Sequence, residues 1–368
     1  MPLSLTPPPI LFDESLEHVG PDEAETAEQL IETLTRINET TLEHEKHAYR
    51  SVHAKSHGLL TGELVVPDGL PIELAQGIFR KAGRYPLVMR LSTVPGDILD
   101  DSVSTPRGMS IKIIGVEGDR LPGSEGDATQ DFVMVNGPAF GAPTAKKFAG
   151  TLKLVAATTD RAEGAKKVIS AVFRGTERLI EAFGGKSSTL LALGGQPETN
   201  PLGDTYYSQA PIRFGDYVVK VSVAPHSPNL TALTGAELNV NGKPDGLRDA
   251  MVEHFAREGG EWDVRVQFCT DSESMPIEDA SVAWSEEKSP YIDVARIVLQ
   301  PQSAWDEARK QAIDDGLSFS PWHGVTAHRP LGSVMRARRV AYSVMAKFRA
   351  HHNGLAISEP TSLDDLKL

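Results

Sequence analysis

The chain has 368 residues, of which 40% are hydrophobic and 24% charged, the balance of a folded globular protein rather than a disordered one. Its net charge of −13, with no basic tract to offset it, argues against a nucleic-acid partner, because phosphate backbones are bound through Lys and Arg. The single cysteine, Cys269, excludes an internal disulfide and any multi-cysteine zinc or iron–sulfur site.

Residues 1–20 contain several prolines but neither the basic start nor the apolar core of a signal peptide. We therefore expect a short flexible leader and a cytoplasmic protein. No uncharged apolar run approaches the roughly twenty residues that a membrane-spanning helix needs, so the sequence also predicts no membrane span.

The first regular element is predicted over residues 21–50, which are rich in Glu, Leu, Ile and Thr and lack glycine, as expected of a solvated helix. From residue 58 to 136, short apolar runs separated by Gly, Pro and Asp clusters predict strands and turns. The clearest runs are Leu87–Leu91, Met109–Ile114 and Asp131–Val135. Apolar residues return to the helical period over residues 145–193, and strand-like runs recur at residues 216–223 and 262–268.

A final long helix is predicted to begin near Ser333, after Pro330, and to end at Asn353-Gly354, since glycine commonly terminates helices. The acidic residues 355–368 are expected to form a flexible tail. Because the sequence shows no internal repeat and no linker, the simplest organisation is a single α+β domain over residues 21–354.

Arg338, Tyr342 and Arg349 are separated by steps of 4 and 7 residues, which places two guanidiniums and one phenol on one stripe of that helix. An adjacent cation favours the phenolate form of tyrosine, and phenolate is the form that serves as an axial ligand to haem iron. A core tyrosine on an arginine-rich helix is the alternative. The stripe by itself leaves both interpretations open.

Two upstream motifs bear on this choice. Arg50-Ser51-Val52-His53-Ala54-Lys55 resembles the distal-histidine motif of haem catalases, and the run from Met89 to Gly96 resembles their Arg-Phe-Ser-Thr-Val strand. The stripe at Tyr342 matches the proximal signature of the same family. Further stretches resemble short catalase-related proteins: Thr205–Gln209, Met275–Ala280, Pro321–His323 and His328–Gly332. The chain is thus similar to the short catalase-related branch of the haem catalase family, from about Leu42 to Gly354.

This resemblance implies an α+β fold in which an antiparallel β-barrel core is surrounded by helices, without the full C-terminal helical region of large catalases. It implies haem b as the cofactor, bound beside the barrel, and a homo-oligomer smaller than the tetramer of large catalases.

The resemblance also implies roles for individual residues. Tyr342 is the expected axial ligand of the haem iron, and Arg338 the group that keeps it a phenolate. His53 is the expected distal acid and base, oriented by Ser92 through a hydrogen bond. The remaining expected cofactor-binding residues are Arg50, Arg90 and Arg349, which pair with the haem propionates, and the pocket aromatics Phe140 and Phe148.

The sequence departs from the family in two places. Catalases place an asparagine in the distal pocket, within an Asp-Leu-Val-Gly-Asn-Asn-Thr-Pro stretch that aligns with residues 131–138 here. Strict alignment puts Val135 at the catalytic asparagine. Asn136 is the catalytic candidate if the strand shifts, although alternation points it to the other face. The family's Pro-Asp-Thr after the tyrosine is Ser343-Val344-Met345 in this chain.

Three functions fit these residues. The first is a haem-dependent oxidoreductase of the catalase or peroxidase type, which processes hydrogen peroxide or an organic hydroperoxide, with a small-molecule reductant if it acts as a peroxidase. The second is a fatty-acid hydroperoxide-rearranging enzyme similar to allene oxide synthases and hydroperoxide lyases. The third is a non-catalytic haem-binding protein. Val52 favours the first, because the allene oxide branch tends to have a hydroxyl residue before the histidine.

Overall fold

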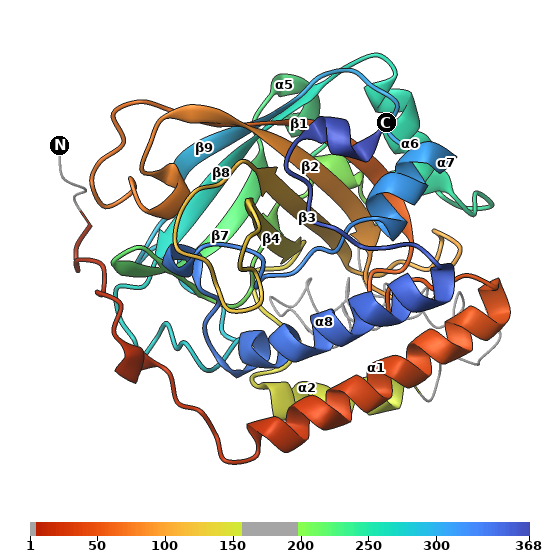
Figure 1. Ribbon diagram of the computed structural model, residues 1–368. Coiled ribbons are helices and arrows are strands. Elements are labelled where there is room, and N and C mark those ends of the chain that lie inside the picture. Colours follow the sequence, from red (N-terminus) through yellow and green to blue (C-terminus); the bar gives the residue numbers. More distant parts are fainter. Residues whose placement is uncertain (1–4, 157–197) are drawn as a thin grey trace, which may run out of the picture.

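A computed structural model describes residues 5–156 and 198–368. Within them, one antiparallel sheet has the strand order β5-β4-β3-β2-β1-β9-β8-β7-β6, and an additional pairing of β5 with β7 closes it into a barrel. The strands are β1 (Ser56–Val66), β2 (Gly83–Thr93), β3 (Arg107–Ile114), β4 (Thr129–Val135), β5 (Tyr206–Tyr207), β6 (Ile212–Phe214), β7 (Tyr217–Pro225), β8 (Gly260–Phe268) and β9 (Ile292–Leu299). The predicted fold, a β-barrel core with surrounding helices, is confirmed (Figure 1).

Side-chain alternation divides each strand between the barrel interior and its outer surface. On β2, Leu87, Met89 and Leu91 belong to the main hydrophobic core, whereas Arg90 and Ser92 lie on the opposite face. The buried face is apolar along most strands, so the barrel is filled by its own side chains. Any ligand site on β1 to β4 must therefore lie on the outer surface.

The strand register arranges the outward side chains of β2, β3 and β4 in three rows across the barrel. The first row is Ser92, Gly108 and Val135; the second is Arg90, Ser110 and Val133; the third is Val88, Lys112 and Asp131. These rows bring together residues that lie about 20 positions apart along the chain. They define the surface on which the candidate site is built.

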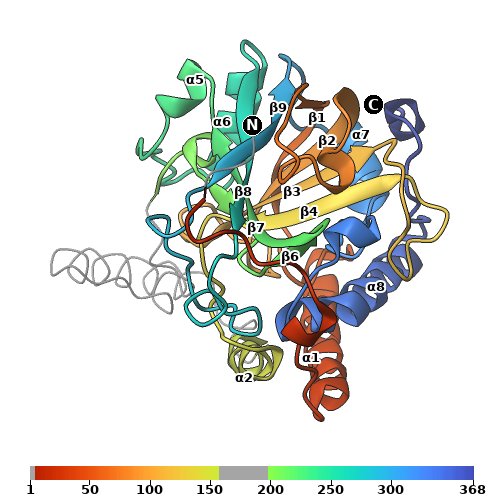
Figure 2. The ribbon, with the colours of Figure 1, turned by 90° about the vertical axis from the view of Figure 1, so that its left-hand side faces the viewer.

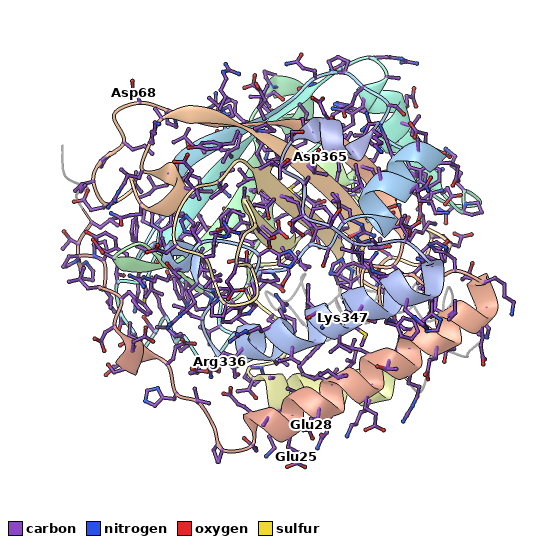
Figure 3. All side chains as sticks on the ribbon, viewed as in Figure 1. Glu25, Glu28, Asp68, Arg336, Lys347 and Asp365 are labelled. Carbon is purple, nitrogen blue, oxygen red and sulfur yellow. The ribbon has the colours of Figure 1, made fainter. Side chains whose placement is uncertain are left out.

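A layer of helices lies on one side of the barrel, where α8 (Ser333–Asn353) runs alongside α1 (Glu23–Glu45) with α2 (Ala145–Ala156) beside them (Figures 1 and 2). The three helices share a hydrophobic cluster that includes Leu30, Leu34, Ala149, Ala341 and Met345. The outer side of α1 is polar, as Glu25 and Glu28 show in Figure 3. Because α1 is apolar on one side and polar on the other, it packs its apolar side against α2 and α8 and leaves its polar side in solvent.

The described chain also has the shorter helices α5 (Pro228–Thr231), α6 (Gly246–Phe255) and α7 (Glu307–Arg309), a π-helical turn over Lys310–Asp315 and several 3-10 turns. The predicted final helix is confirmed, because α8 ends at Asn353 and Gly354 follows with φ of 64°. The predicted helix over residues 21–50 is shorter, since Lys46 takes the left-handed conformation and ends α1. Of the helical segment expected over residues 145–193, residues 157–193 lie outside the described residues.

The two terminal segments, expected to be flexible, have specific contacts where they are described. In the N-terminal segment, the backbone amide of Ile10 donates to Cys269 O and that of Phe12 to Asp216 O. In the C-terminal segment, Leu366 is buried against a small apolar cluster on the outside of β1 and β2, and Glu359 pairs with Lys112. Apolar and charged anchors spaced along these segments thus tie them to the barrel.

None of the described helices combines the length and apolarity needed to cross a membrane.

Candidate functional site

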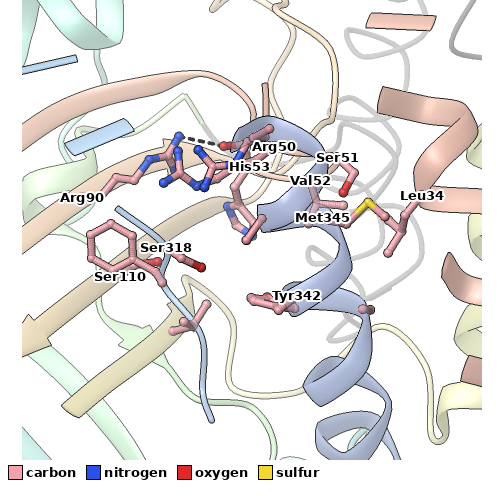
Figure 4. Close-up of a pocket in the computed structure, with 15 residues that line it drawn as sticks. Leu34, Arg50, Ser51, Val52, His53, Arg90, Ser110, Ser318, Tyr342 and Met345 are labelled. Atoms are coloured by element: carbon pink, nitrogen blue, oxygen red, sulfur yellow. Dashed lines mark hydrogen bonds between the residues drawn. The ribbon is translucent and has the colours of Figure 1, made fainter. Parts of the chain in front are cut away.

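A cavity of about 610 Å³, including its open mouth, lies between the outer surface of the barrel and α8 (Figure 4). Its lining residues come from α1, the segment before β1, the second row of the barrel surface, the segment before α8 and α8 itself: Leu34, Arg50, Ser51, Val52, His53, Arg90, Ser110, Val133, Ser318, Phe319, Ala341, Tyr342, Met345, Ala346 and Arg349.

Tyr342 enters this cavity from α8. Its neighbours Ala341 and Met345 pack against α1 in the helical layer, which fixes the rotation of α8 and turns the phenol toward the barrel. His53 lines the same cavity from the opposite side, in the segment that leads into β1 (Figure 4). The structure therefore places a phenol and an imidazole in one cavity although 289 residues separate them in the chain.

His53 is held by backbone and side-chain contacts. Its backbone has φ of 57°, an uncommon conformation for a non-glycine residue, and its amide donates to Val94 O at 2.7 Å. Its Nδ1 lies 3.1 Å from Ser92 Oγ, the orienting contact expected for Ser92. Burial, together with the charges of Arg90, Arg338 and Arg50, lowers the pKa of His53 to about 3. The imidazole is therefore neutral at physiological pH and able to accept a proton.

Gly108 provides the space for this ring. It lies beside Ser92 in the first row of the barrel surface, and a Cβ atom at Gly108 would overlap Nδ1 and Cε1 of His53. A side chain here must push the imidazole away from its hydrogen bond with Ser92. The packing of the histidine against the barrel thus depends on a glycine whose role sequence reasoning missed.

For the peroxide chemistry that the resemblance to catalases implies, we expect the substitution Gly108→Ala to reduce turnover by about 10- to 100-fold, since small displacements of a catalytic group are costly. Haem binding should change little, because Tyr342 and the arginines do not contact Gly108. Initial rates and a haem titration followed at the Soret band measure the two quantities. Gly141→Ala is the matched control, since nothing lies within 4 Å of a Cβ at that position. Wild-type turnover in Gly108→Ala would contradict the proposed packing.

Three arginines line one end of the cavity, around a single carboxylate. Asp314 Oδ1 accepts from Arg90 Nε at 2.5 Å and from Arg50 Nη1 at 2.9 Å. Arg349 donates to the backbone oxygens of Asp314 and Leu317. Arg90 and Arg349 are only 1% and 3% exposed. Among the described residues, no other acidic side chain bonds to these guanidiniums, although the charge of Asp315 also acts on Arg50 and Arg349. The group therefore keeps an excess of positive charge.

The charge excess affects the arginines themselves. Burial and the neighbouring charge of Arg90 lower the pKa of Arg349 to about 10, because Asp314 only partly compensates. Burial and the charges of Arg349 and Arg90 lower the pKa of Arg50 well below its usual value. Buried cations in such excess favour an anionic ligand at this end of the cavity.

The other predicted cofactor-binding residues lie next to the cavity but outside its lining. The guanidinium of Arg338 lies 5.3 Å from the ring centroid of Phe140, and its Nη1 is 3.6 Å from the sulfur of Met335. Phe140 and Phe148 pack together with ring centroids 4.9 Å apart. Within the described chain Arg338 has no hydrogen bond to Tyr342, so its expected action on the phenol stays a prediction.

The expectation for Asn136 requires a correction. Its side-chain Oδ1 accepts from the backbone amide of Arg107 at 2.8 Å, and its Nδ2 donates to Asp204 at 3.0 Å. It does not line the cavity. The reason is strand alternation: β4 keeps its register, so Val133 and Val135 take the outward positions and Asn136 follows on the other side. The position beside His53 is therefore apolar.

Several lining or supporting residues were not predicted. Ser110 occupies the second row beside Arg90, and its outward position follows from the alternation in Met109–Ile114. Ser318 comes from the segment before α8, and no local pattern identifies it. Asp314 lies in a π-helical turn, and the only sequence signal is an acidic pair before Gly316.

The third row of the barrel surface carries a separate charged cluster. Lys112 donates to both carboxylate oxygens of Asp131 at 2.8 and 2.9 Å and to Glu359 of the C-terminal segment. Nδ1 of His323 lies 3.3 Å from Asp131 and 3.2 Å from Glu359. Two carboxylates and a histidine at this spacing could bind a metal. The ammonium of Lys112 and the protonated ring of His323 together balance the two carboxylates, so we interpret the cluster as an ion-pair network that holds the C-terminal segment.

This network makes stability depend on pH. Burial disfavours the charged form of His323, but its contacts with Asp131 and Glu359 outweigh burial and raise its pKa to about 9, above the roughly 6.5 of an unfolded chain. The contribution of protonated His323 to the free energy of unfolding is fully present below about pH 6.5 and is lost as the pH rises through about 9.

We expect His323→Gln to lower the free energy of unfolding by roughly 1–3 kcal/mol near pH 6.5 and to have a much smaller effect above about pH 9. Urea unfolding of wild type and variant at both pH values measures the difference. His226→Gln, which alters a more exposed histidine paired with Asp263, is the control. An equal loss of unfolding free energy at both pH values would show that His323 does not act through its positive charge.

No protein-family model matches this sequence, and a search of curated proteins finds no match. Three similar solved structures are a fungal catalase (TM-score 0.60, 20% identity, covering 85% of this chain and 61% of that chain), catalase A from Saccharomyces cerevisiae (0.59, 19%, 89% and 66%) and a bacterial catalase (0.57, 18%, 85% and 60%). At these identities the likeness concerns the fold: the chain has a catalase fold and spans less than two thirds of the length of each of these catalases.

Proposed function

We propose that this catalase-fold protein is a haem-dependent enzyme that processes peroxides, with haem b in the cavity beside α8. One observation carries the proposal: a phenol, a neutral imidazole and three arginines with an excess of positive charge line the same cavity. Haem b carries two propionates, so its charge matches this excess. The catalase names of the similar structures support the same cofactor.

Each group has a distinct task in this proposal. Tyr342 would hold the iron through its phenol oxygen, and haem would supply, when bound, the two-electron chemistry that breaks the O–O bond. Arg50, Arg90 and Arg349 bind the propionates, for which guanidinium geometry is well suited.

His53 moves the proton. Because Ser92 contacts Nδ1, the other ring nitrogen, Nε2, is left to accept the proton from the peroxide O–H and to return it to the departing oxygen. The oxygen then leaves as water or as an alcohol rather than as hydroxide or alkoxide. Ser92 and Gly108 keep the imidazole in place for both transfers.

The surroundings of His53 bear on the substrate. Val133 lines the cavity, and Val135 occupies the row position next to Gly108. Asn136 does not reach this side. A wall of this kind offers hydrogen peroxide few polar contacts and accommodates the apolar chain of an organic hydroperoxide. We therefore keep a hydroperoxide-rearranging enzyme as the second candidate function.

Three assays on the haem-loaded protein decide between the candidates. Oxygen release from hydrogen peroxide, followed with an oxygen electrode, establishes catalase activity, and oxidation of an added phenol establishes peroxidase activity. Loss of the conjugated-diene absorbance of a fatty-acid hydroperoxide without a reductant supports the rearranging enzyme instead. A stable Soret band with no reaction in any assay indicates a haem-binding protein. Absence of a Soret band after haem is supplied would refute the proposal.

A further inference from the structure

Asp314 lies behind the arginines rather than in the cavity, and a π-helical turn places it there. In this turn the amide of Gly316 donates to Gln311 O at 3.0 Å, five residues back. A Cβ at Gly316 would lie 2.6 Å from the backbone oxygen of Ala312, so the turn ends on a residue without a side chain. Single π turns are uncommon and occur often at functional sites.

The turn lets one residue contact three segments of the chain. The carboxylate binds Arg50 from the segment before β1 and Arg90 from β2, while the backbone oxygen binds Arg349 from α8. Asp314 Oδ2 also accepts from Ser56 Oγ at 2.5 Å. Burial alone would raise the pKa of Asp314, but Arg90, Arg50 and Ser56 lower it to about 2, so the carboxylate stays charged.

These bonds leave specific donors available. Arg90 uses Nε toward Asp314 and Nη2 toward the backbone oxygens of His53 and Ala54, and its Nη1 has no partner within the described residues. Arg50 and Arg349 use their Nη atoms on Asp314 and Leu317, and neither Nε has a partner in the described chain. All three arginines line the cavity, and each keeps N–H groups that no described residue uses.

We propose that Asp314 is a positioning residue for the cofactor's carboxylates: it anchors the three arginines so that their remaining donors address two propionates. This inference rests on the proposed function. Without the carboxylate, three buried guanidiniums repel one another at short range, and their flexible side chains turn away toward water. The protein would then lose its recognition of the propionates rather than its affinity for the porphyrin ring.

The test compares haem b with haem b dimethyl ester, which has the same ring but no propionate charge. Dissociation constants for both are measured by Soret titration on the wild type and on Asp314→Asn, which keeps the side-chain shape. Asp315→Asn is the matched control, because that carboxylate bonds His47 at 2.9 Å instead of the arginines. Comparing the two ligands on the two proteins isolates the free-energy coupling between Asp314 and the propionates.

We expect the wild type to prefer haem b over the ester by about 100-fold. Asp314→Asn should reduce this preference at least tenfold, and Asp315→Asn should leave it within about twofold. Equal weakening of both ligands in Asp314→Asn, or no change in either, would show that Asp314 does not act through the propionates. Wild-type protein that binds neither ligand would instead refute the proposed function and this inference with it.

A second variant covers the case in which Asp314→Asn does not fold, as judged by circular dichroism. Ser56→Ala removes one hydrogen bond to the carboxylate and keeps its charge. It should reduce the preference for haem b by about threefold, in the same direction as Asp314→Asn. A preference that is unchanged in folded Ser56→Ala protein would count against the role of Asp314.

Discussion

Replacing Tyr342 with phenylalanine is expected to weaken haem binding by about 100-fold or more and to change the spectrum of any haem that remains. Five described residues of α8 line the cavity, and Tyr342 is the only one of them whose side chain carries an oxygen atom. Phenylalanine keeps the ring that packs in α8 but removes the ligand atom. Haem titration at the Soret band and the absorption spectrum of the purified variant measure both effects.

Tyr291→Phe is the control for this change. Tyr291 also loses a phenolic oxygen, but its ring packs on Tyr207 and faces Arg265, and it does not line the cavity. Haem affinity should remain within about twofold of the wild type in this control. Tight binding with an unchanged spectrum in Tyr342→Phe would mean that another residue binds the iron.

Replacing His53 with alanine should leave haem in place and reduce peroxide turnover by about 10²- to 10⁴-fold, the usual contribution of a general acid and base. His53 shares the cavity with Tyr342 but contributes no bond to the arginine group through its side chain. His53→Asn is a useful second variant, because asparagine tolerates the left-handed backbone found at this position. Steady-state rates and Soret titration of both variants measure the effect.

The pH profile provides a second readout for His53. The pKa of His53 is about 3, so the imidazole stays neutral and able to accept a proton from neutral pH down to about pH 4. Turnover limited by this group should therefore be constant over that range and fall only as the pH approaches 3. A decline centred near pH 6.5 would show that His53 titrates as an exposed histidine. His226→Asn, at a residue on the barrel surface paired with Asp263, should leave turnover unchanged.

Local patterns were sufficient to predict much of the architecture. The period-two runs at Leu87–Leu91, Met109–Ile114 and Asp131–Val135 correspond to β2, β3 and β4, and the run after Pro330 to α8. These elements follow from interactions within a few residues, which a sequence displays directly. The resemblance of the segments around His53, Arg90 and Tyr342 to catalases then identified the family fold, since their order along the chain matches as well as their composition.

The residues that hold His53 and Arg90 in place could not be predicted from local patterns. Arg90 bonds Asp314 across 224 residues, and Lys112 bonds Glu359 across 247. No spacing rule connects such positions, because their distance depends on how the barrel closes and on how the chain returns over it. The space that Gly108 leaves for His53 is equally invisible, since a glycine in a strand has several explanations.

The sequence by itself determined the elements, the barrel, and the residue types expected at a haem site: Tyr342, His53 and the arginines. Only the tertiary structure decided that Asp314 joins the three arginines, that Gly108 leaves room for the ring of His53, and that Asn136 bonds Arg107 and Asp204 outside the cavity. The physical reason is that secondary structure depends on neighbours in the chain, whereas the charge and shape of a cavity depend on neighbours in space.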